Sequence, residues 1–418
     1  MRTFLLGAVG ALSSIALSIT LAATSSSAPS PIRASAQLPE IPLSQFQKSI
    51  LDDRGVKLGG IGSGLFPIKG GLNTGSGAGG GNEYWTITDR GPNGEVKVND
   101  KDRRTFIVPE FNPALVRVAV TGPKLEVREV VPITTASGKP VTGLSNIAGR
   151  DEEPYGADAE TKLAYNPNGL DTEGVVRTAN GHFWVVDEYG PSIVELDAAG
   201  KVLTRHFPAG VDAQYRTAGV EANVTGALPA DHAKRRNNRG YEDIALLPDG
   251  KTIAVALQSS IEVSGDRDRI ITDIFTFDTT TGRVAGVFPY RFDAASTFTT
   301  TAGTRGRDLK ISALIPVSDT EVIVEERTDT EARFYQVKLD PAVKLITEAN
   351  KQLVANLAGV AGVPGKIEGA ARDGKNLVVI SDNDFGFDGS KAYPNGTKVT
   401  DSGIETLLVE VDLDRLQR

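Results

Sequence analysis

A short motif recurs five times along the chain, and this repetition constrains the fold more than any other feature of the sequence. Each copy has a short apolar segment, a turn, a β-rich segment that usually ends in acid, and a later alternating strand that ends near Asp. Such repetition is typical of architectures in which one supersecondary unit is stacked several times. The first equivalent position of the copies holds Ser63, Glu173, Glu242, Ser312 and Glu368.

Regular spacing inside the copies supports their equivalence. A second equivalent position follows the first by 14 residues in three copies and by 16 in a fourth. The segments between the two positions, such as HFWVV and TIAVAL, are rich in β-branched and aromatic residues, which predicts strands. No stretch has a sustained period of 3.6 residues. The second position holds Asp89, Asp187 with Glu188, Gln258, Glu326 and Asp382.

Short strands repeated in this way predict an all-β protein, a β-propeller whose blades pack radially around a channel. The copies lie 110, 69, 70 and 56 residues apart, further than the ~40 to 50 residues of a compact blade. Either five motif-bearing blades carry long insertions, or a sixth or seventh blade lacks the motif. The span Gly94–Asp171 is the expected place for a hidden blade or a long excursion, since PALVRVAVT and KLEVREVVPI are strand-like. A pair of β-sandwiches is the alternative fold.

The N-terminal segment predicts export. Arg2 precedes a nearly uninterrupted apolar run at 4–23, and Ala34-Ser35-Ala36 forms a small-x-small cleavage site, which predicts a signal peptide over residues 1–36. An uncleaved anchor is the alternative, because the run approaches the ~20 residues that span a bilayer; after cleavage we expect no membrane span. Residues 37–57 are interpreted as a lead-in, with a possible ring-closing strand within 41–58, and residues 58–418 as the propeller.

Composition excludes several classes of site and partner. With no cysteine, disulfides, thiolate nucleophiles and Cys-ligated metals are excluded, and three histidines argue against a multi-His metal site. Export without disulfides favours a secreted or periplasmic bacterial protein. The net charge of −8 argues against nucleic acid and anionic lipid as partners. We expect a monomer that acts on a small molecule.

The acids at the equivalent positions are candidate metal ligands. Equivalent positions in successive blades converge on one mouth of a propeller channel, and carboxylates crowded there raise one another's pKa unless cations neutralise them. Oxygen donors favour Ca²⁺, with Mg²⁺ or Mn²⁺ as alternatives. Alternatively, these acids accept backbone N–H bonds within their own blades. Asp384 joins the candidates because residues 382–389 resemble a calcium loop without the EF-hand Glu. The candidates are Asp89, Glu173, Asp187, Glu188, Glu242, Glu326, Glu368, Asp382 and Asp384.

Arg90 and Arg327 stand beside acids of the second position and are the candidate catalytic residues, with Arg239 and Lys366 as further basic neighbours. A guanidinium fork suits phosphate or carboxylate oxygens, although each Arg could instead pair with the adjacent acid. No Gly-x-Ser-x-Gly elbow is present, so hydrolysis would use a metal-activated water rather than a side-chain nucleophile. The glycine-rich tract 70–81 is interpreted as a flap near the channel mouth.

Together these motifs resemble those of the bacterial phytase-like family, an exported domain named for the esterase-like activity of phytase. The resemblance runs from about residue 58 to the C-terminus. It rests on Ser-Gly-Leu at 63–65, Thr-Asp-Arg-Gly-Pro-Asn at 88–93, Glu-Gly at 173–174, Asp-Glu-Tyr-Gly-Pro-Ser at 187–192, Asn-Arg-Gly-Tyr-Glu at 238–242, Glu-Glu-Arg at 325–327, Lys-Ile-Glu-Gly at 366–369 and Ser-Asp-Asn-Asp-Phe at 381–385. The third copy departs from the pattern, with Gln258 in place of an acid and Asp243 in place of glycine.

The resemblance implies hydrolysis of phosphoric or carboxylic esters, without a settled catalytic set to carry over. We therefore expect an exported, metal-dependent hydrolase of a small anionic ester, with phosphoesters favoured. Two alternatives stay open: a non-catalytic propeller that binds a ligand or a cell-envelope partner, and a Ca²⁺-dependent propeller lactonase.

Overall fold

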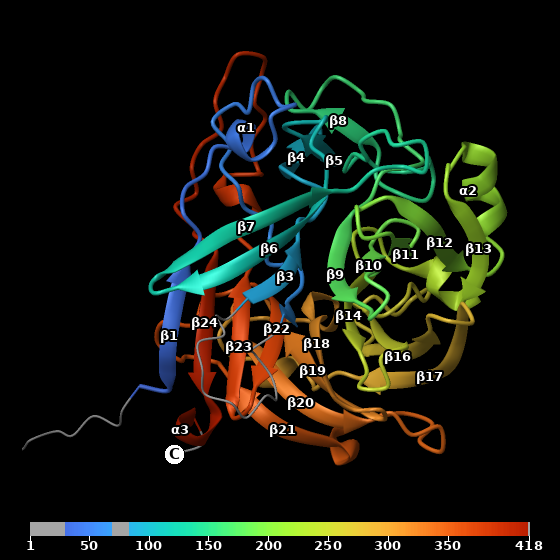
Figure 1. The fold of residues 1–418 in the computed structure, drawn as a ribbon, viewed down its shortest axis with the longest axis vertical. Coiled ribbons are helices and arrows are strands. Elements are labelled where there is room, and N and C mark those ends of the chain that lie inside the picture. The colour runs from blue at the N-terminus through green and yellow to red at the C-terminus, as the bar shows by residue number, and fades with distance from the viewer. Residues whose placement is uncertain (1–29, 69–82, 417–418) are drawn as a thin grey trace, which may run out of the picture. The chain divides into compact units, whose positions relative to one another are not determined.

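Five antiparallel units of four strands make up most of the computed structural model, which describes residues 30–68 and 83–416 (Figure 1). Most of the predicted leader and the whole tract 70–81 lie outside the described residues. Among the described residues, no helix is long and apolar enough to cross a membrane. The helices are α1 (Leu43–Phe46), α2 (Asp212–Ala218) and α3 (Leu413–Leu416), with short 3-10 turns η1 (Ala230–Lys234), η2 (Ala295–Thr297), η3 (Gly306–Asp308), η4 (Glu348–Asn350) and η5 (Asp384–Gly386).

Strands that follow one another in the sequence form each unit, with two exceptions. An excursion separates the second and third strands of the first unit, and the last unit takes its outermost strand from the N-terminal segment. The second unit carries an additional parallel strand, β13 (Asn223–Leu228). The units are β2 (Phe66–Ile68), β3 (Glu83–Ile87), β6 (Ala114–Thr121) and β7 (Lys124–Pro132); β9 (Thr172–Arg177), β10 (Phe183–Asp187), β11 (Ser192–Leu196) and β12 (Val202–Pro208); β14 (Tyr241–Leu246), β15 (Thr252–Leu257), β16 (Ile271–Asp278) and β17 (Arg283–Arg291); β18 (Lys310–Ser318), β19 (Glu321–Arg327), β20 (Ala332–Lys338) and β21 (Lys351–Asn356); and β22 (Ile367–Asp373), β23 (Asn376–Ser381), β24 (Leu407–Asp412) and β1 (Ile32–Gln37).

Shared hydrophobic cores close the units into a ring. Every unit shares a core with the next, and the last unit shares one with the first, where Tyr84 and Val116 pack in the same cluster as Ile380 and Leu408. In Figure 1, β3, β9, β14, β18 and β22 surround a common centre. All five motif copies form the first two strands of a unit, so the predicted β-propeller is confirmed.

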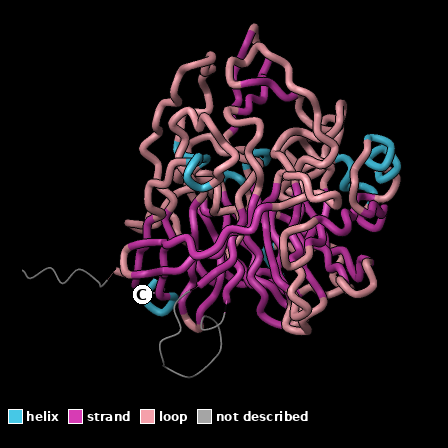
Figure 2. Tube along the Cα trace, turned by 45° about the horizontal axis from the view of Figure 1, so that its top comes forward, coloured by secondary structure: helices cyan, strands magenta, loops and turns pink. Residues whose placement is uncertain are grey.

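Burial explains why the second strand of each unit is so apolar. In β10, β15 and β23, every residue except Thr252 is buried. Because neighbouring units cover both faces of these strands, each face needs apolar side chains and the alternation of a half-exposed strand disappears. Long loops gather on one side of the strands, as Figure 2 shows.

The span Gly94–Asp171 contains an excursion and no further four-stranded unit. The two strand-like segments predicted within it are β6 and β7, which complete the first unit. The excursion forms a small separate sheet of β4 (Asn93–Val98), β5 (Lys101–Phe106) and β8 (Pro154–Gly156).

The ring-closing strand is β1, not a segment within 41–58. Residues 41–58 contain α1 and an isolated bridge from Pro42 to Lys57. In contrast, β1 pairs antiparallel with β24 from Ile32 to Gln37, and its Ala36 is buried. Cleavage after Ala36 would remove five of the six residues of β1.

We therefore predict that processing occurs before Ile32. A chain that begins at Gln37 should lose about 2 to 4 kcal/mol of unfolding free energy relative to one that begins at Pro31, because the β1–β24 hydrogen bonds and the burial of Ile32 and Ala36 are lost. Thermal unfolding of the two chains measures this difference. N-terminal sequencing of the exported protein is the second check, and a terminus at Gln37 on a fully stable protein would contradict the prediction.

Candidate functional site

Three carboxylates from the second unit meet inside the ring. Asp171 immediately precedes β9, Glu173 lies on β9, and Glu188 follows β10. One oxygen from each lies within 4.8 Å of the others, and all three side chains are buried. We call Asp171, Glu173 and Glu188 the carboxylate triad.

Arg90 compensates two members of the triad. Its guanidinium is in ion-pair contact with Asp171 and lies 3.4 Å from Glu188 Oε2, while its backbone N–H donates to Asp171 Oδ1 at 3.2 Å. Glu152 lies on the other side of the guanidinium at 3.5 Å. With 4% of its side chain exposed, Arg90 orients the triad and has little surface left for a substrate.

Glu173 is the uncompensated member. Its carboxylate accepts no hydrogen bond from any described residue, and the residue is buried, with only 8% of its surface exposed. Burial, and next the charge of Glu242, raise the pKa of Glu173 well above its ordinary value. Burial and Asp171 raise the pKa of Glu188 in the same way. Ionising these groups is therefore unfavourable unless a cation binds among them.

A second buried cation, Arg327, ties together acids of the third and fifth units. Its Nε donates to Ser312 Oγ at 2.7 Å, its guanidinium contacts Glu368, and it lies 3.8 Å from Glu242 Oε1. Ser312 Oγ in turn donates to Glu242 at 3.0 Å. The first equivalent positions of three units are thus joined in one network.

Asp89 and Asp382 lie between the fifth and first units. Burial and then Asp382 raise the pKa of Asp89, whose Oδ1 accepts the N–H of Gly91 at 2.7 Å. Lys366 Nζ lies 2.7 Å from Asp382 and contacts Asp384. The Asp384 side chain is 60% exposed, so it lies at the surface end of this ion-pair group.

Asp187 is a predicted ligand that lies outside the triad. Asp187 is saturated: it accepts hydrogen bonds from Arg205, at 2.8 Å, from Ser192 Oγ, and from the N–H groups of Asp171 and Tyr189. Burial raises the pKa of Asp187 to about 6, although Arg205 opposes this shift. Because Asp187 accepts the backbone N–H of Asp171, it helps to fix the position of this triad residue.

Glu326 belongs to a separate cluster in the fourth unit. It is in contact with Lys351 and accepts from Tyr290 Oη at 2.6 Å and from the N–H of Asp293 at 2.8 Å. Successive residues of a strand point to opposite faces, so its neighbours Glu325 and Arg327 share the other face of β19. On that face, Arg327 makes the ion-pair contacts with Glu242 and Glu368.

Sequence reasoning missed Asp171 and Glu325. Glu325 is fully buried with neither carboxylate oxygen hydrogen-bonded among the described residues, and burial raises its pKa well above the usual value. Asp171 directly precedes the inner strand β9. It could have been found from the DTEG segment, in which it lies two residues before the predicted ligand Glu173. Glu325 could have been found from the alternation of β19, since it shares a face with Arg327.

The triad has the chemistry of a site for a hard divalent cation. Its donors are all carboxylate oxygens, which Ca²⁺, Mg²⁺ and Mn²⁺ prefer. Glu173 has its lone pairs free of hydrogen bonds from described residues. Ser63 Oγ, at the equivalent position of the first unit, is also buried without a described partner. Three protein ligands would leave coordination positions for water and for a substrate oxygen.

Comparison with known proteins identifies the family but not a ligand. A secreted protein of Arthroderma benhamiae, described as uncharacterized, is 27% identical over 210 residues, which are 43% of this chain; the chain matches 40% of that relative's length. Solved structures that are similar include a luciferin-regenerating enzyme (10% identity, 85% of this chain and 92% of that one, TM-score 0.36) and a thermostable family-43 glycoside hydrolase (12%, 84% and 89%, TM-score 0.38).

A third similar structure is regucalcin from Agrobacterium tumefaciens, described as a calcium-binding protein (12% identity, 84% of this chain and 91% of that one, TM-score 0.33). At such TM-scores the fold assignment rests on the sheet topology and the shared cores. The family match is much broader: the phytase-like family, described as esterase-like activity of phytase, matches residues 70–385. This span contains the triad, Arg90, Arg327 and three of the five motif copies in full, so the chain belongs to the phytase-like family.

Proposed function

We propose that this chain is an exported ester hydrolase that holds a divalent cation, Ca²⁺ in the first place, at the carboxylate triad and acts on phosphoesters. The observation that carries the proposal is the buried triad itself, in which Glu173 has no described hydrogen-bond donor and a raised pKa. Family membership supports ester hydrolysis, and the secreted relative together with the predicted leader supports export.

The roles of the residues follow from their contacts. A cation bound by Asp171, Glu173 and Glu188 would polarise an ester oxygen and lower the pKa of a water molecule. Arg90 holds Asp171 and Glu188 in place from one side, and Asp187 fixes the Asp171 backbone from the other. Arg327 contacts Glu368 and lies beside Glu242, so it holds these two carboxylates in one network.

Lys310 is the group suited to exchange a proton. Burial, and then the charges of Arg327 and Arg239, lower the pKa of its ammonium to about 8, while Asp329 accepts from its Nζ at 2.9 Å. A lysine with a pKa near neutrality can protonate a leaving oxygen at the pH of the reaction. Its position beside Arg327 links it to the network around Glu242.

The test is to measure turnover and thermal unfolding on metal-depleted protein with Ca²⁺, Mg²⁺ or Mn²⁺ restored one at a time. We expect Ca²⁺ to raise the melting temperature, since a ligand at 100 times its Kd adds about 2.7 kcal/mol to the folded state, and to restore hydrolysis of para-nitrophenyl phosphate. An unchanged melting curve at millimolar Ca²⁺ would contradict the metal site. Binding of Ca²⁺ without turnover on phosphate esters, acyl esters or lactones would favour a non-catalytic binding role.

A further inference from the structure

Between β3 and β6, the first unit carries an excursion whose strands β4, β5 and β8 form a sheet of their own. This sheet lies at the top of the view in Figure 1, on the side where the long loops gather. Among the described strands, none of the ring pairs with it. Two charged residues of the excursion, Arg104 on β5 and Glu152 shortly before β8, nevertheless form a chain of ion pairs that ends at the carboxylate triad.

Glu152 lies between two arginines. Its Oε2 is 3.5 Å from Arg90 Nη1, and its two oxygens accept hydrogen bonds from Nε and Nη2 of Arg104, both at 3.1 Å. Burial raises the pKa of Glu152, but Arg104 and then Arg90 lower it, and the net shift is downward. Glu152 is therefore ionised at neutral pH and carries a full negative charge next to Arg90.

The excursion also fixes Arg104. Its Nη1 donates to Asn93 Oδ1 at 3.0 Å, and its Nη2 donates to Glu95 Oε2 at 3.0 Å. Both acceptors lie on β4, the neighbour of β5 in the sheet. Only 10% of the Arg104 side chain is exposed. The sheet thus holds the Arg104 guanidinium, and with it Glu152, in one position relative to Arg90.

Arg90 divides its guanidinium between the excursion and the triad. Its Nη2 faces Asp171 and Glu188, whereas its Nη1 faces Glu152 and lies 3.4 Å from Tyr189 Oη. A divalent cation at the triad would be attracted to the same carboxylates as Nη2, so the cation and Arg90 weaken each other's binding. The negative charge of Glu152 attracts Arg90 from the other side and limits this competition.

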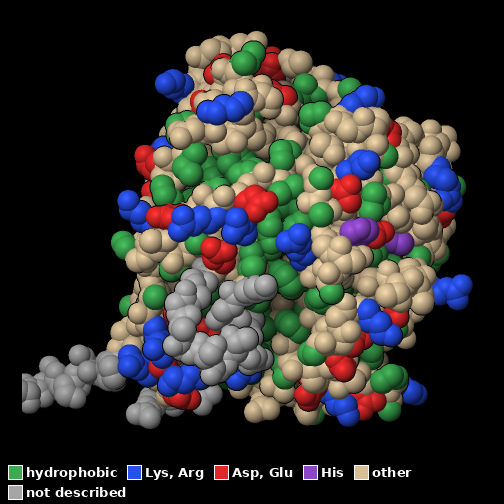
Figure 3. Space-filling model, viewed as in Figure 1, with side chains coloured by type: hydrophobic (Ala, Val, Ile, Leu, Met, Phe, Trp, Pro, Cys, Tyr) green, Lys and Arg blue, Asp and Glu red, His purple; other side chains and the backbone are tan. Residues whose placement is uncertain are grey.

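Burial distinguishes this chain of ion pairs from the charged pairs of the surface. On the face shown in Figure 3, basic and acidic side chains are interspersed, and exposed pairs contribute little because water and salt screen them. The Arg90 side chain is 4% exposed and the Glu152 side chain 20% exposed, so their interaction is screened much less. A change of charge at Glu152 should therefore alter the electrostatics of the triad.

We propose that Glu152 is a positioning residue that acts through Arg90 to set the affinity of the carboxylate triad for a divalent cation, and that Arg104 limits its effect. The inference rests on the proposed function, because it requires a cation at the triad. Two opposite effects follow. Without the charge of Glu152, Arg90 pairs more closely with the triad and cation binding weakens. Without Arg104, Glu152 draws Arg90 outward and cation binding strengthens.

Calorimetric titration of metal-depleted protein with Ca²⁺ at fixed ionic strength measures both effects. We expect Glu152→Gln to bind Ca²⁺ about 10-fold more weakly than the wild type, and Arg104→Gln to bind it about 3-fold more tightly. Glu152→Asp, which keeps the charge, should recover most of the lost affinity. A merely structural role would weaken binding in every variant, so the opposite signs identify the positioning role. Thermal unfolding shows which variants are folded, and Arg104→Gln decides the question if Glu152→Gln does not fold.

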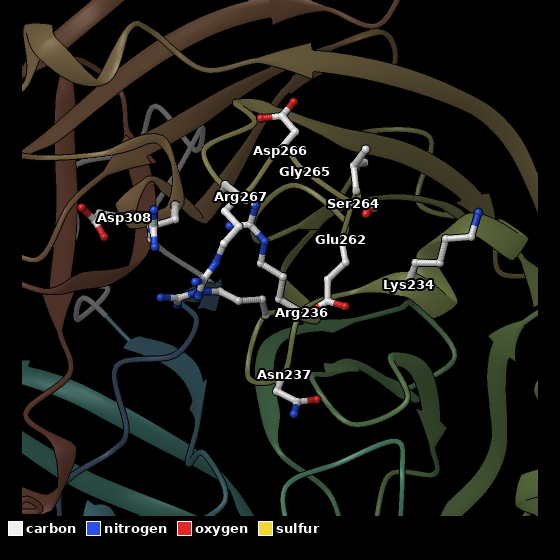
Figure 4. A pocket seen from close by; sticks show the side chains of 12 residues that line it. Lys234, Arg236, Asn237, Glu262, Ser264, Gly265, Asp266, Arg267 and Asp308 are labelled. Carbon is white, nitrogen blue, oxygen red and sulfur yellow. Dashed lines mark hydrogen bonds between the residues drawn. The ribbon is translucent and has the colours of Figure 1, made fainter. Parts of the chain in front are cut away.

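Two exposed residues provide matched controls. Glu153→Gln removes the carboxylate next in sequence to Glu152, which accepts from Lys162 Nζ at 2.6 Å and from Tyr155 Oη at 2.5 Å. Arg267→Gln removes a guanidinium from the wall of a pocket of about 780 Å³ that belongs to the third and fourth units and is shown in Figure 4. Both controls should bind Ca²⁺ within about 2-fold of the wild type, because exposed charges are screened.

The outcomes separate this inference from the function on which it rests. A folded Glu152→Gln protein that binds Ca²⁺ as tightly as the wild type, or an Arg104→Gln protein that binds it more weakly, would overturn the positioning role and leave the metal site in place. An equal loss of affinity in Glu153→Gln would reduce the effect to net charge and also overturn it. Wild-type protein that binds no divalent cation would contradict both proposals. The expected affinities in a protein that hydrolyses no ester would support the positioning role and contradict the hydrolase.

Discussion

Glu173→Gln is expected to abolish Ca²⁺ binding and reduce ester turnover about 100-fold or more, while making the metal-free protein more stable at neutral pH. Glutamine keeps the size and shape of the side chain but removes the charge. Glu173 is buried, accepts no hydrogen bond from a described residue and lies near Glu242. Its ionised carboxylate can therefore bind a cation, and without a cation the ionised form destabilises the folded protein.

The sign of the pH effect follows from the raised pKa of Glu173. Below the ordinary pKa of a glutamate, about 4.3, the group is protonated in both the folded and the unfolded chain and changes nothing. Above it, the unfolded chain ionises first, so the folded state loses stability as the pH rises toward the folded-state pKa. Glutamine cannot ionise, and the stability advantage of the variant should therefore grow from about pH 4.5 upward.

Melting temperatures from pH 4 to 8, with and without Ca²⁺, measure both effects. The control is Glu110→Gln, which removes the same charge from an exposed position and should change neither turnover nor the Ca²⁺-induced shift. A Glu173→Gln protein with normal turnover and a normal Ca²⁺-induced shift in melting temperature would remove Glu173 from the proposed site.

Internal repetition made the fold predictable. Copies of one strand-turn-strand motif, whose polar ends are 14 residues apart in three of the five, correspond to the first two strands of each unit, because the strands of every unit pack against neighbouring units in the same way. The ring closure could not be predicted in this way. β1 has the sequence IRASAQ, whose small and polar residues resemble a cleavage region more than a strand, and its pairing with β24 and, at Gln37, with β7 defines it.

The site was less predictable, because spacing identifies equivalent positions but not the face on which a side chain lies. Glu173, Glu242 and Glu368 were found as inner-strand residues and do enter one network. At the strand ends, the 14-residue spacing selected Asp187, Glu326 and Asp382, and Glu188 and Arg327 were named as their neighbours. The side chains of Asp187 and Glu326 have partners outside the triad. The next residues, Glu188 and Arg327, are the ones that point into the ring. A one-residue step along a strand exchanges the two faces.

Asp187→Asn is expected to destabilise the protein by about 3 kcal/mol and to leave the Ca²⁺ affinity of the folded protein within about 2-fold of wild type. The fully buried Asp187 carboxylate accepts from Arg205, Ser192 and two backbone N–H groups. An asparagine can replace only one of its two oxygens. Its amide nitrogen would then face either Arg205 and Ser192 or the two backbone N–H groups, donor against donor, and in both orientations a buried cation loses its counter-charge.

Chemical unfolding at pH 7.5, above the Asp187 pKa of about 6, measures the loss of stability, and calcium titration of the folded fraction measures the affinity. Asp319→Asn, at an exposed position, is the matched control and should change neither quantity. The two variants should therefore show opposite effects. Glu173→Gln should lose Ca²⁺ binding and gain stability, whereas Asp187→Asn should keep Ca²⁺ binding and lose stability. A stable Asp187→Asn protein that no longer binds Ca²⁺ would instead make Asp187 a ligand and require the second unit to rearrange when the cation binds.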